Sequence, residues 1–209
     1  MLKSVCGDWK MKDKYAKMIY GIFALFFSFV VIYSLSLGER FYVFDSILFI
    51  TLSSLFFFYY EKLNLNLFSY LIINVAMSLH ELGRFGFFSM QFFNVNWDIY
   101  THVIGSIAIA ILIYSALKSR VRLYEKGFLK YFLLIVFLAS IGIALVGEFV
   151  EFGGTLFLED GQGLLGLESE AGPFENVSID YWDTMTDLLA NAAGSIIGII
   201  FCCSFYRKS

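Results

Sequence analysis

The sequence predicts an all-α integral membrane protein with six transmembrane helices and both termini in the cytoplasm. Apolar residues make up 59% of the 209 residues, they form six long runs, and the positive charges fall between alternate runs. Soluble domains are only about 45–50% apolar. Only helices and closed barrels satisfy the backbone inside a bilayer, and continuous apolar runs favour helices over the alternating strands of a barrel.

Each of the six runs approaches the ~20 residues that a helix needs to cross the hydrocarbon core. The predicted spans are residues 19–37, 41–60, 66–88, 98–117, 129–153 and 183–206. A lysine-rich segment, residues 1–18, precedes them and is expected to be a cytoplasmic tail rather than a signal peptide, because no small-residue cleavage pattern follows the first run. We therefore expect one transmembrane domain, residues 19–206, in a multi-pass protein of the cell membrane.

The orientation follows from the connections between the runs. Of the 15 Lys and Arg residues, all but Arg40 and Arg84 fall on the side that holds both termini. Cytoplasmic connections carry the excess of positive charge, so that side is predicted to be cytoplasmic. No basic surface with interleaved aromatic residues indicates a nucleic-acid partner; the expected surroundings are the lipid bilayer.

The longest predicted connection, about residues 154–182, lies on the opposite side. It contains acidic residues, five Gly or Pro residues over 161–173, and no Lys or Arg. A loop of this length is either disordered or a functional lid. We expect an extracytoplasmic acidic loop, whose acidity either serves a site nearby or serves solubility.

Ionisable residues inside the apolar runs are the strongest functional signal. A charged group at mid-membrane costs about 2.5–3.5 kcal/mol, so a cluster of them predicts a functional site. On the topology above, four spans carry polar residues near the outer surface. They are His80, Glu81 and Arg84; Asp98 and His102; Glu148 and Glu151; and Asp183, Asp187 and Asn191.

Residue spacing places most of these side chains on shared helix faces. Residues three or four apart on a helix are neighbours, as are Asp98 with His102 and Glu148 with Glu151. Ala190, Gly194 and Gly198 repeat every four residues on the last span, a spacing that lets membrane helices approach closely. The polar groups are therefore expected to converge.

Six carboxyl groups against one arginine and two histidines require protons or cations for compensation. Facing helices that present carboxylate, imidazole and amide groups resemble metal sites in helical bundles. The predicted metal ligands are His102, Glu148, Glu151, Asp187, Asn191 and His80. Oxygen-rich ligands without thiolates favour a divalent Mg, Mn, Fe or Ca ion over Zn.

The corresponding function is a metal-dependent hydrolase or transferase that acts on a lipid-linked or envelope substrate. Asp183, Asp98 or Glu81 is the expected general base, and Arg84 is expected to hold an anionic substrate group. Two other classes stay open: an ion- or proton-coupled transporter and a non-enzymatic membrane binding or assembly protein. The inner halves of the spans carry few ionisable residues, which disfavours a transport path.

Structural roles are the alternatives for single residues. Asp98 and Asp183 stand at the predicted starts of two helices, where carboxylates commonly cap the free backbone amides. His102 by itself is a common kind of satisfied core histidine. Glu148 and Glu151 are harder to explain structurally, because two carboxylates one turn apart in an apolar helix repel each other.

Three stretches resemble a known family. They are NWDIYTHVIGS (96–106), GEFVEFG (147–153) and DYWDTMTDLLANAAGSIIG (180–198). They are similar to the YjdF-like integral membrane proteins, and distantly to the VanZ-like group. The resemblance covers roughly residues 80–200 and implies a fold and the positions of a site, with no assigned reaction.

Overall fold

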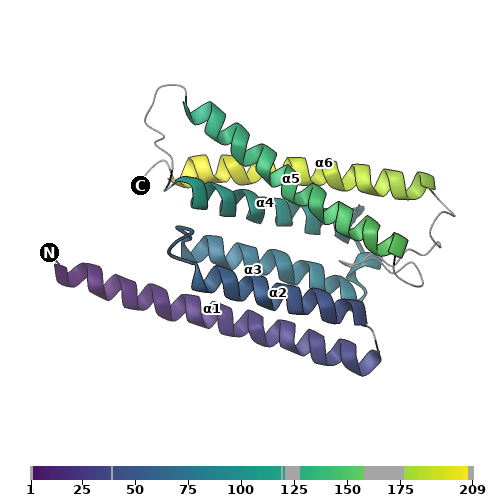
Figure 1. The fold of residues 1–209 in the computed structure, drawn as a ribbon, viewed down its shortest axis with the longest axis horizontal. Coiled ribbons are helices and arrows are strands. Elements are labelled where there is room, and N and C mark those ends of the chain that lie inside the picture. The colour runs from purple at the N-terminus through teal and green to yellow at the C-terminus, as the bar shows by residue number, and fades with distance from the viewer. Residues whose placement is uncertain (1, 39, 119, 121–127, 158–176, 207–209) are drawn as a thin grey trace.

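The computed structural model describes residues 2–38, 40–118, 120, 128–157 and 177–206. Within them, the side chains of 2–13, 40–41, 84, 154–157, 177–181 and 205–206 lie outside the description. Six α-helices run roughly along one axis (Figure 1). They are α1 (Leu2–Leu37), α2 (Arg40–Phe58), α3 (Leu67–Leu82), α4 (Trp97–Lys118), α5 (Phe128–Phe157) and α6 (Val177–Tyr206). The all-α prediction is confirmed for this part of the chain.

The bundle has two halves. Helices α1, α2 and α3 form one half, and α4, α5 and α6 form the other, with α5 crossing its neighbours obliquely (Figure 1). The principal contact between the halves is that of α3 with α4. Helix α1 begins and α6 ends at the same end of the bundle. The two termini therefore share a side, as the predicted topology requires.

Four helices contain segments long and apolar enough to cross a membrane. These segments are Lys14–Leu37, Trp97–Lys118, Phe128–Gly153 and Trp182–Ser204. Their outward side chains are large and apolar: Leu25 is 74% exposed and Leu189 is 72% exposed. Such a surface fits a lipid environment. The apolar segments of α2 and α3, Tyr42–Phe58 and Leu67–Leu82, are shorter, so the count of six spans stays a prediction.

Three helices extend beyond the predicted spans. Helix α1 begins at Leu2, so the segment expected as a basic tail continues the first span as helix. Helix α5 continues to Phe157 and α6 begins at Val177, so the predicted loop at 154–182 is helical at both ends. Hydrophobicity marked the membrane part of these helices, whereas the backbone helix continues past it. Residues 158–176, including most of the expected lid, lie outside the described residues.

The longer α6 also changes the role of Asp183. The residue lies inside the helix, six positions after Val177, so the alternative that it is an N-cap is wrong. Asp98 is the second residue of α4 and is not its N-cap either. A carboxylate in the first turn nevertheless interacts favourably with the positive end of the helix dipole.

Helix α3 ends six residues before the predicted end of its span. After Leu82, two 3₁₀ turns follow, η1 (Gly83–Phe85) and η2 (Phe87–Ser89), separated by Gly86 at φ +85°. A left-handed residue of this kind stops an α-helix, and glycine adopts it without steric cost. A Cβ atom on Gly83 would also collide with the ring of Phe88. The prediction of helix to residue 88 was therefore wrong.

A short hairpin that the sequence did not predict connects η2 to α4. Strands β1 (Gln91–Phe92) and β2 (Val95–Asn96) are antiparallel and flank Phe93 and Asn94, which both have positive φ. Two such residues form the turn that matches strand twist, usually with glycine. Trp97 follows, and its indole Nε1 donates to the carbonyl of Leu79 at 3.1 Å. The hairpin thereby anchors the start of α4 against α3.

The glycines of α6 pack against α4. A Cβ atom on Gly194 would collide with the carbonyl oxygen of Val103 and lie 3.0 Å from Ser106 Cβ. One on Gly198 would lie 2.9 Å from both Ala110 Cβ and the Ile107 carbonyl oxygen. The small-residue repeat on α6 therefore allows close packing, as predicted. This contact brings the polar stripe of α6 against the polar face of α4.

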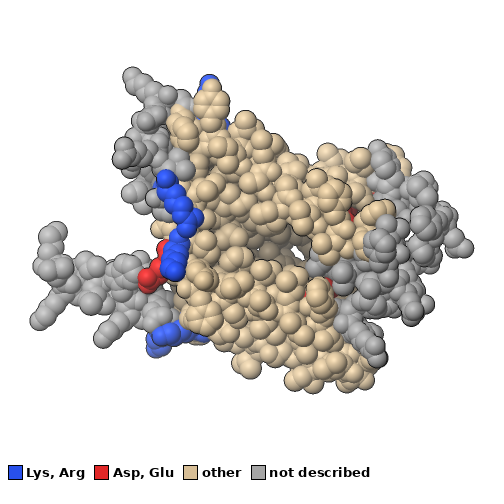
Figure 2. All heavy atoms as spheres, viewed as in Figure 1, with Lys and Arg blue, Asp and Glu red and all other residues tan. Residues whose placement is uncertain are grey.

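Lysine and arginine side chains gather at the end of the bundle that holds the two termini (Figure 2). Lys118 ends α4, Lys62 lies between α2 and α3, and Lys130 lies in the first turn of α5. Arg40 and Arg84, the two residues predicted for the other side, lie outside the described side chains. The charge asymmetry that the sequence indicated is therefore present at one end of the molecule.

The start of α3 yields a test of local stability. Asn66 Oδ1 accepts hydrogen bonds from the backbone N–H of Ser69 at 2.7 Å and from its hydroxyl at 3.1 Å. We expect Asn66→Ala to lower the free energy of unfolding by about 0.5–2 kcal/mol, the usual effect of removing an N-cap. Thermal unfolding in detergent measures it. Asn66→Ser keeps a capping oxygen and should stay near wild type; equal loss in both variants would contradict the cap.

Candidate functional site

His102 is the centre of a polar cluster between α4 and α6. Its Nε2 atom lies 3.5 Å from Asp98 Oδ1, one helical turn earlier on α4, and 3.7 Å from Asp187 Oδ1 on α6. One ligand atom from each of these three residues lies within 4.8 Å of the others. Two carboxylates and an imidazole thus converge from two helices.

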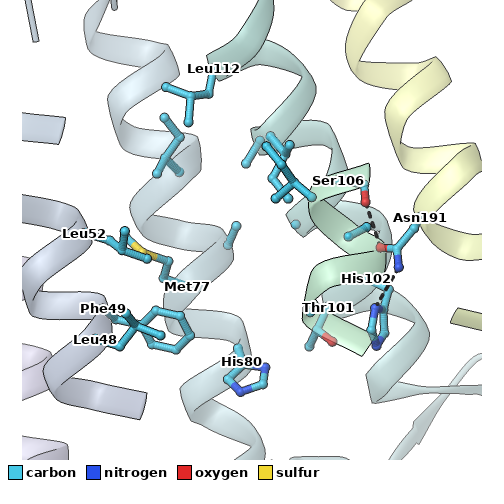
Figure 3. Close-up of a pocket in the computed structure, with 18 of the residues that line it drawn as sticks. Leu48, Phe49, Leu52, Met77, His80, Thr101, His102, Ser106, Leu112 and Asn191 are labelled. Carbon is cyan, nitrogen blue, oxygen red and sulfur yellow. Dashed lines mark hydrogen bonds between the residues drawn. The ribbon is translucent and has the colours of Figure 1, made fainter. Parts of the chain in front are cut away.

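The other ring nitrogen of His102 faces a second set of groups. Nδ1 lies 3.2 Å from Asn191 Nδ2 and 3.7 Å from Glu148 Oε1 on α5. The Asn191 amide also donates to Glu148 at 3.5 Å and accepts a 2.7 Å hydrogen bond from the Ser106 hydroxyl (Figure 3). A carboxylate and an amide at one nitrogen fix the orientation of the ring and leave the other nitrogen directed at Asp98 and Asp187.

The carboxyl groups of the cluster are removed from the surface. Asp187 is 3% exposed, Glu148 is 7% and Glu151 is 9%. Buried carboxylates are stable only with a proton, a cation or a full set of hydrogen bonds. His102 lies within ion-pair distance of Glu148 and Asp187. Protons or a cation are further means of compensating such buried carboxyl groups.

A cavity of about 440 Å³ adjoins the cluster. All of the helices from α2 to α6 contribute to its walls. His102, Glu148, Glu151 and Asn191 line it, and His80 on α3 lies across from His102 (Figure 3). The ring of His80 stands edge-on to Phe49, with centroids 5.5 Å apart. Figure 2 shows the surface hollowed between the two halves of the bundle.

The predicted site residues divide into three groups. His102, Asp187 and Asp98 meet directly, while Glu148 and Asn191 contact the second nitrogen of His102. Glu151 and His80 line the adjoining cavity, and their roles as metal ligands stay predictions. Asp183 is exposed, one turn before Asp187, and the side chain of Arg84 lies outside the described ones.

Glu81 does not line the cavity. It is 1% exposed and accepts a 2.9 Å hydrogen bond from Ser46 on α2. Adjacent residues on a helix point about 100° apart because a turn holds 3.6 residues, and here His80 faces the cavity whereas Glu81 faces Ser46 on α2. Asn74, seven residues earlier, likewise bonds to Ser53 of α2. The expectation that Glu81 is a general base in the cluster has no support in its position.

The structure adds two hydroxyl groups that the sequence reasoning missed. Ser106 bonds to Asn191, and Thr101 donates to the Asp98 carbonyl at 2.7 Å. Both line the cavity. Ser106 lies four residues after His102, so the same spacing rule that paired Asp98 with His102 could have identified it. Serine is common in apolar membrane helices, so its presence at this spacing did not distinguish Ser106 as a site residue.

A family model described as predicted membrane protein (DUF2238) matches residues 15–208. The chain belongs to the DUF2238 family. The match covers α1 from residue 15 onward, the other five α-helices of this DUF2238 protein and every residue of the cluster. No curated protein and no solved structure matches the chain. The resemblances to the YjdF-like and VanZ-like groups stay predictions.

Proposed function

We propose that this DUF2238 protein is a membrane-embedded, metal-dependent hydrolase or transferase that acts on a lipid-linked or envelope substrate. The observation that carries the proposal is the meeting of Asp98, His102 and Asp187, whose ligand atoms lie within 4.8 Å of one another beside a cavity. Intramembrane ionisable groups are rare and mark functional sites.

The distances in the trio fit a coordination shell. Ligands about 2.0–2.2 Å from a metal lie roughly 3.0–3.5 Å from each other in tetrahedral or octahedral geometry. The two distances from His102 Nε2, 3.5 and 3.7 Å, need only a slight contraction to match. Glu148 Oε1, 3.7 Å from the opposite ring nitrogen, would become the outer carboxylate that metal-binding histidines commonly have if it moved to hydrogen-bonding distance. Two carboxylates and one imidazole favour Mg, Mn or Fe.

Three protein ligands leave positions on the metal for water and substrate. A divalent ion there would polarise a phosphoryl or carbonyl oxygen and lower the pKa of a bound water. Glu151, buried in the wall of the same cavity, is the best-placed general base among the described carboxylates outside the trio and Glu148. Asp183, exposed one turn before Asp187, is the alternative.

The distribution of charge supports an outward-facing site. The end of the bundle that gathers Lys and Arg is inferred to be cytoplasmic by the positive-inside rule. His102 lies in the second turn of α4, whereas Lys118 ends that helix, so the cluster is near the opposite, extracytoplasmic surface. Envelope substrates are accessible from that side.

Metal analysis of the purified protein tests the proposal. The full chain in phosphatidylcholine nanodiscs is stripped with a chelator, loaded with Mn²⁺ and washed. We expect one bound Mn²⁺ per chain with a nitrogen coupling in its electron paramagnetic resonance spectrum, and loss of that coupling in His102→Gln. Absence of stoichiometric binding for Mg, Mn, Fe, Ca and Zn alike would overturn the proposal.

A further inference from the structure

The cavity beside the cluster is polar at one end and apolar at the other. The walls formed by α3, α4 and α5 show the same gradient. On α3 the lining passes from His80 to Ile73, on α4 from His102 to Leu112, and on α5 from Glu151 to Ile143. The helices alternate in direction, so this agreement reflects position in the cavity rather than a trend along the chain. The shape matches a molecule with one polar and one apolar end.

The apolar part is long enough to hold part of a hydrocarbon chain. Ten residues separate His102 from Leu112 on α4, or about 15 Å at the helical rise. The volume, about 440 Å³, lies within the range of small-molecule sites. Protein interiors rarely leave voids larger than a water molecule, and apolar cavities stay dry and take up apolar ligands. An apolar space of this size within a bilayer is therefore suited to hydrocarbon.

Small residues keep the cavity open. Gly105 and Gly147 line it, and a Cβ atom on either would meet nothing within 4 Å. By contrast, Gly194 and Gly198 on α6 are packed tightly against α4. The glycines of the bundle thus serve two purposes: two close a helix contact, and two border empty space next to His102 and Glu148.

We propose that the cavity binds the single hydrocarbon chain of an amphiphile whose phosphate or carboxylate head group lies at the His102 end. The choice of an anionic head group rests on the proposed function, because an oxygen anion would complete the coordination of the metal. The hollow between the two halves of the bundle provides a sideways route from the bilayer (Figure 2). The acidic cluster without a metal would instead favour an ammonium head group.

Photolabelling in nanodiscs tests this inference. The probe is hexadecyl phosphate with a diazirine either beside the phosphate or at the chain end, at low mole fraction in phosphatidylcholine. We expect saturable labelling near Thr101 by the first probe and near Leu112 by the second, since the chain then lies along α4. Uniform labelling of lipid-exposed residues, or equal labelling by a diazirine-bearing alkane without a head group, would overturn it.

Leu52 and Leu55 on α2 provide a matched pair of variants. Leu52 lines the cavity, whereas Leu55 is 46% exposed on the outside of the same helix. Leu52→Trp is expected to reduce labelling at Leu112 at least tenfold, and Leu55→Trp to leave it unchanged. Gly105→Val, which adds volume in open space, serves as a second blocking variant should Leu52→Trp fail to fold. Full labelling in both blocking variants would overturn the inference.

Metal content separates the two proposals. Leu52→Trp leaves the trio intact, so Mn²⁺ binding should persist while chain labelling is lost. If no metal binds to the wild-type protein but saturable labelling of the cavity persists, the cavity binds a hydrocarbon chain and the metal-dependent function is contradicted. Preferential labelling by the corresponding hexadecylamine probe would contradict the anionic head group. In the wild-type protein, Mn²⁺ binding without cavity labelling would overturn the amphiphile proposal and leave the metal site.

Discussion

Replacing Asp187 by asparagine is expected to lower the affinity for Mn²⁺ by more than about 100-fold. The change removes one of the three groups that converge at His102 Nε2, where Asp187 Oδ1 lies 3.7 Å away. Loss of an outer-shell partner alone typically costs about 10–100-fold in metal affinity, so loss of a direct ligand should cost more. Titration of the nanodisc protein with Mn²⁺, followed by electron paramagnetic resonance, measures the dissociation constant.

Two further variants make this prediction specific. Asp183→Asn removes the same charge from an exposed position one turn earlier on α6 and should change the affinity little. Glu148→Gln keeps the three ligands but weakens the contact at His102 Nδ1. The loss of Mn²⁺ affinity in this variant should therefore fall between the losses in Asp183→Asn and Asp187→Asn. Equal losses in Asp183→Asn and Asp187→Asn would indicate a general charge effect and contradict direct ligation.

Gly194→Leu is expected to destabilise the fold by about 1–3 kcal/mol or more, the usual cost of overpacking. A side chain there collides with the backbone of α4 at Val103, and a helix backbone cannot yield as a flexible side chain can. The same displacement should weaken Mn²⁺ binding, because this contact holds Asp187 and Asn191 against His102. Thermal unfolding in detergent and the Mn²⁺ titration provide both measurements.

Gly142→Leu is the matched control. Gly142 lies on α5, it is exposed, and a Cβ atom on it meets nothing within 4 Å. Loss of unfolding free energy should therefore be small in this variant. If Gly194→Leu were as stable as Gly142→Leu, the α4–α6 contact would not depend on close backbone approach, and its role in assembling the cluster would have to be abandoned.

The spacing of residues along single helices was enough to predict much of the site. The pairing of Asp98 with His102 is a property of one helix, and the structure shows it directly. A partner on another helix was also foreseeable in kind, because polar groups in apolar helices turn toward each other. Asp187 was predicted as a metal ligand and Asp183 as a general base, but the distance of each from His102 depends on the packing of Gly194 and Gly198 of α6 on α4.

Helix boundaries were predicted least well. Hydrophobicity marks where a helix lies in the membrane, but the backbone hydrogen bonds of α1, α5 and α6 extend further. The end of α3 depends on the left-handed Gly86 and on the ring of Phe88 against Gly83, contacts between residues that hydrophobicity treats as part of one run. The Phe93–Asn94 turn lacks glycine and so gave no hairpin signal.

Composition and spacing alone were enough for a helical membrane protein with polar groups near one surface. The free-energy cost of an unsatisfied backbone or of a charged side chain inside a bilayer is much the same in any fold. No tertiary information was therefore needed for this prediction. The cavity, the division of His80 from Glu81, and the two faces of the His102 ring came from helix packing. Close contact at the α6 glycines and open space at Gly105 and Gly147 are opposite outcomes for one residue type, and only the neighbouring helices distinguish them.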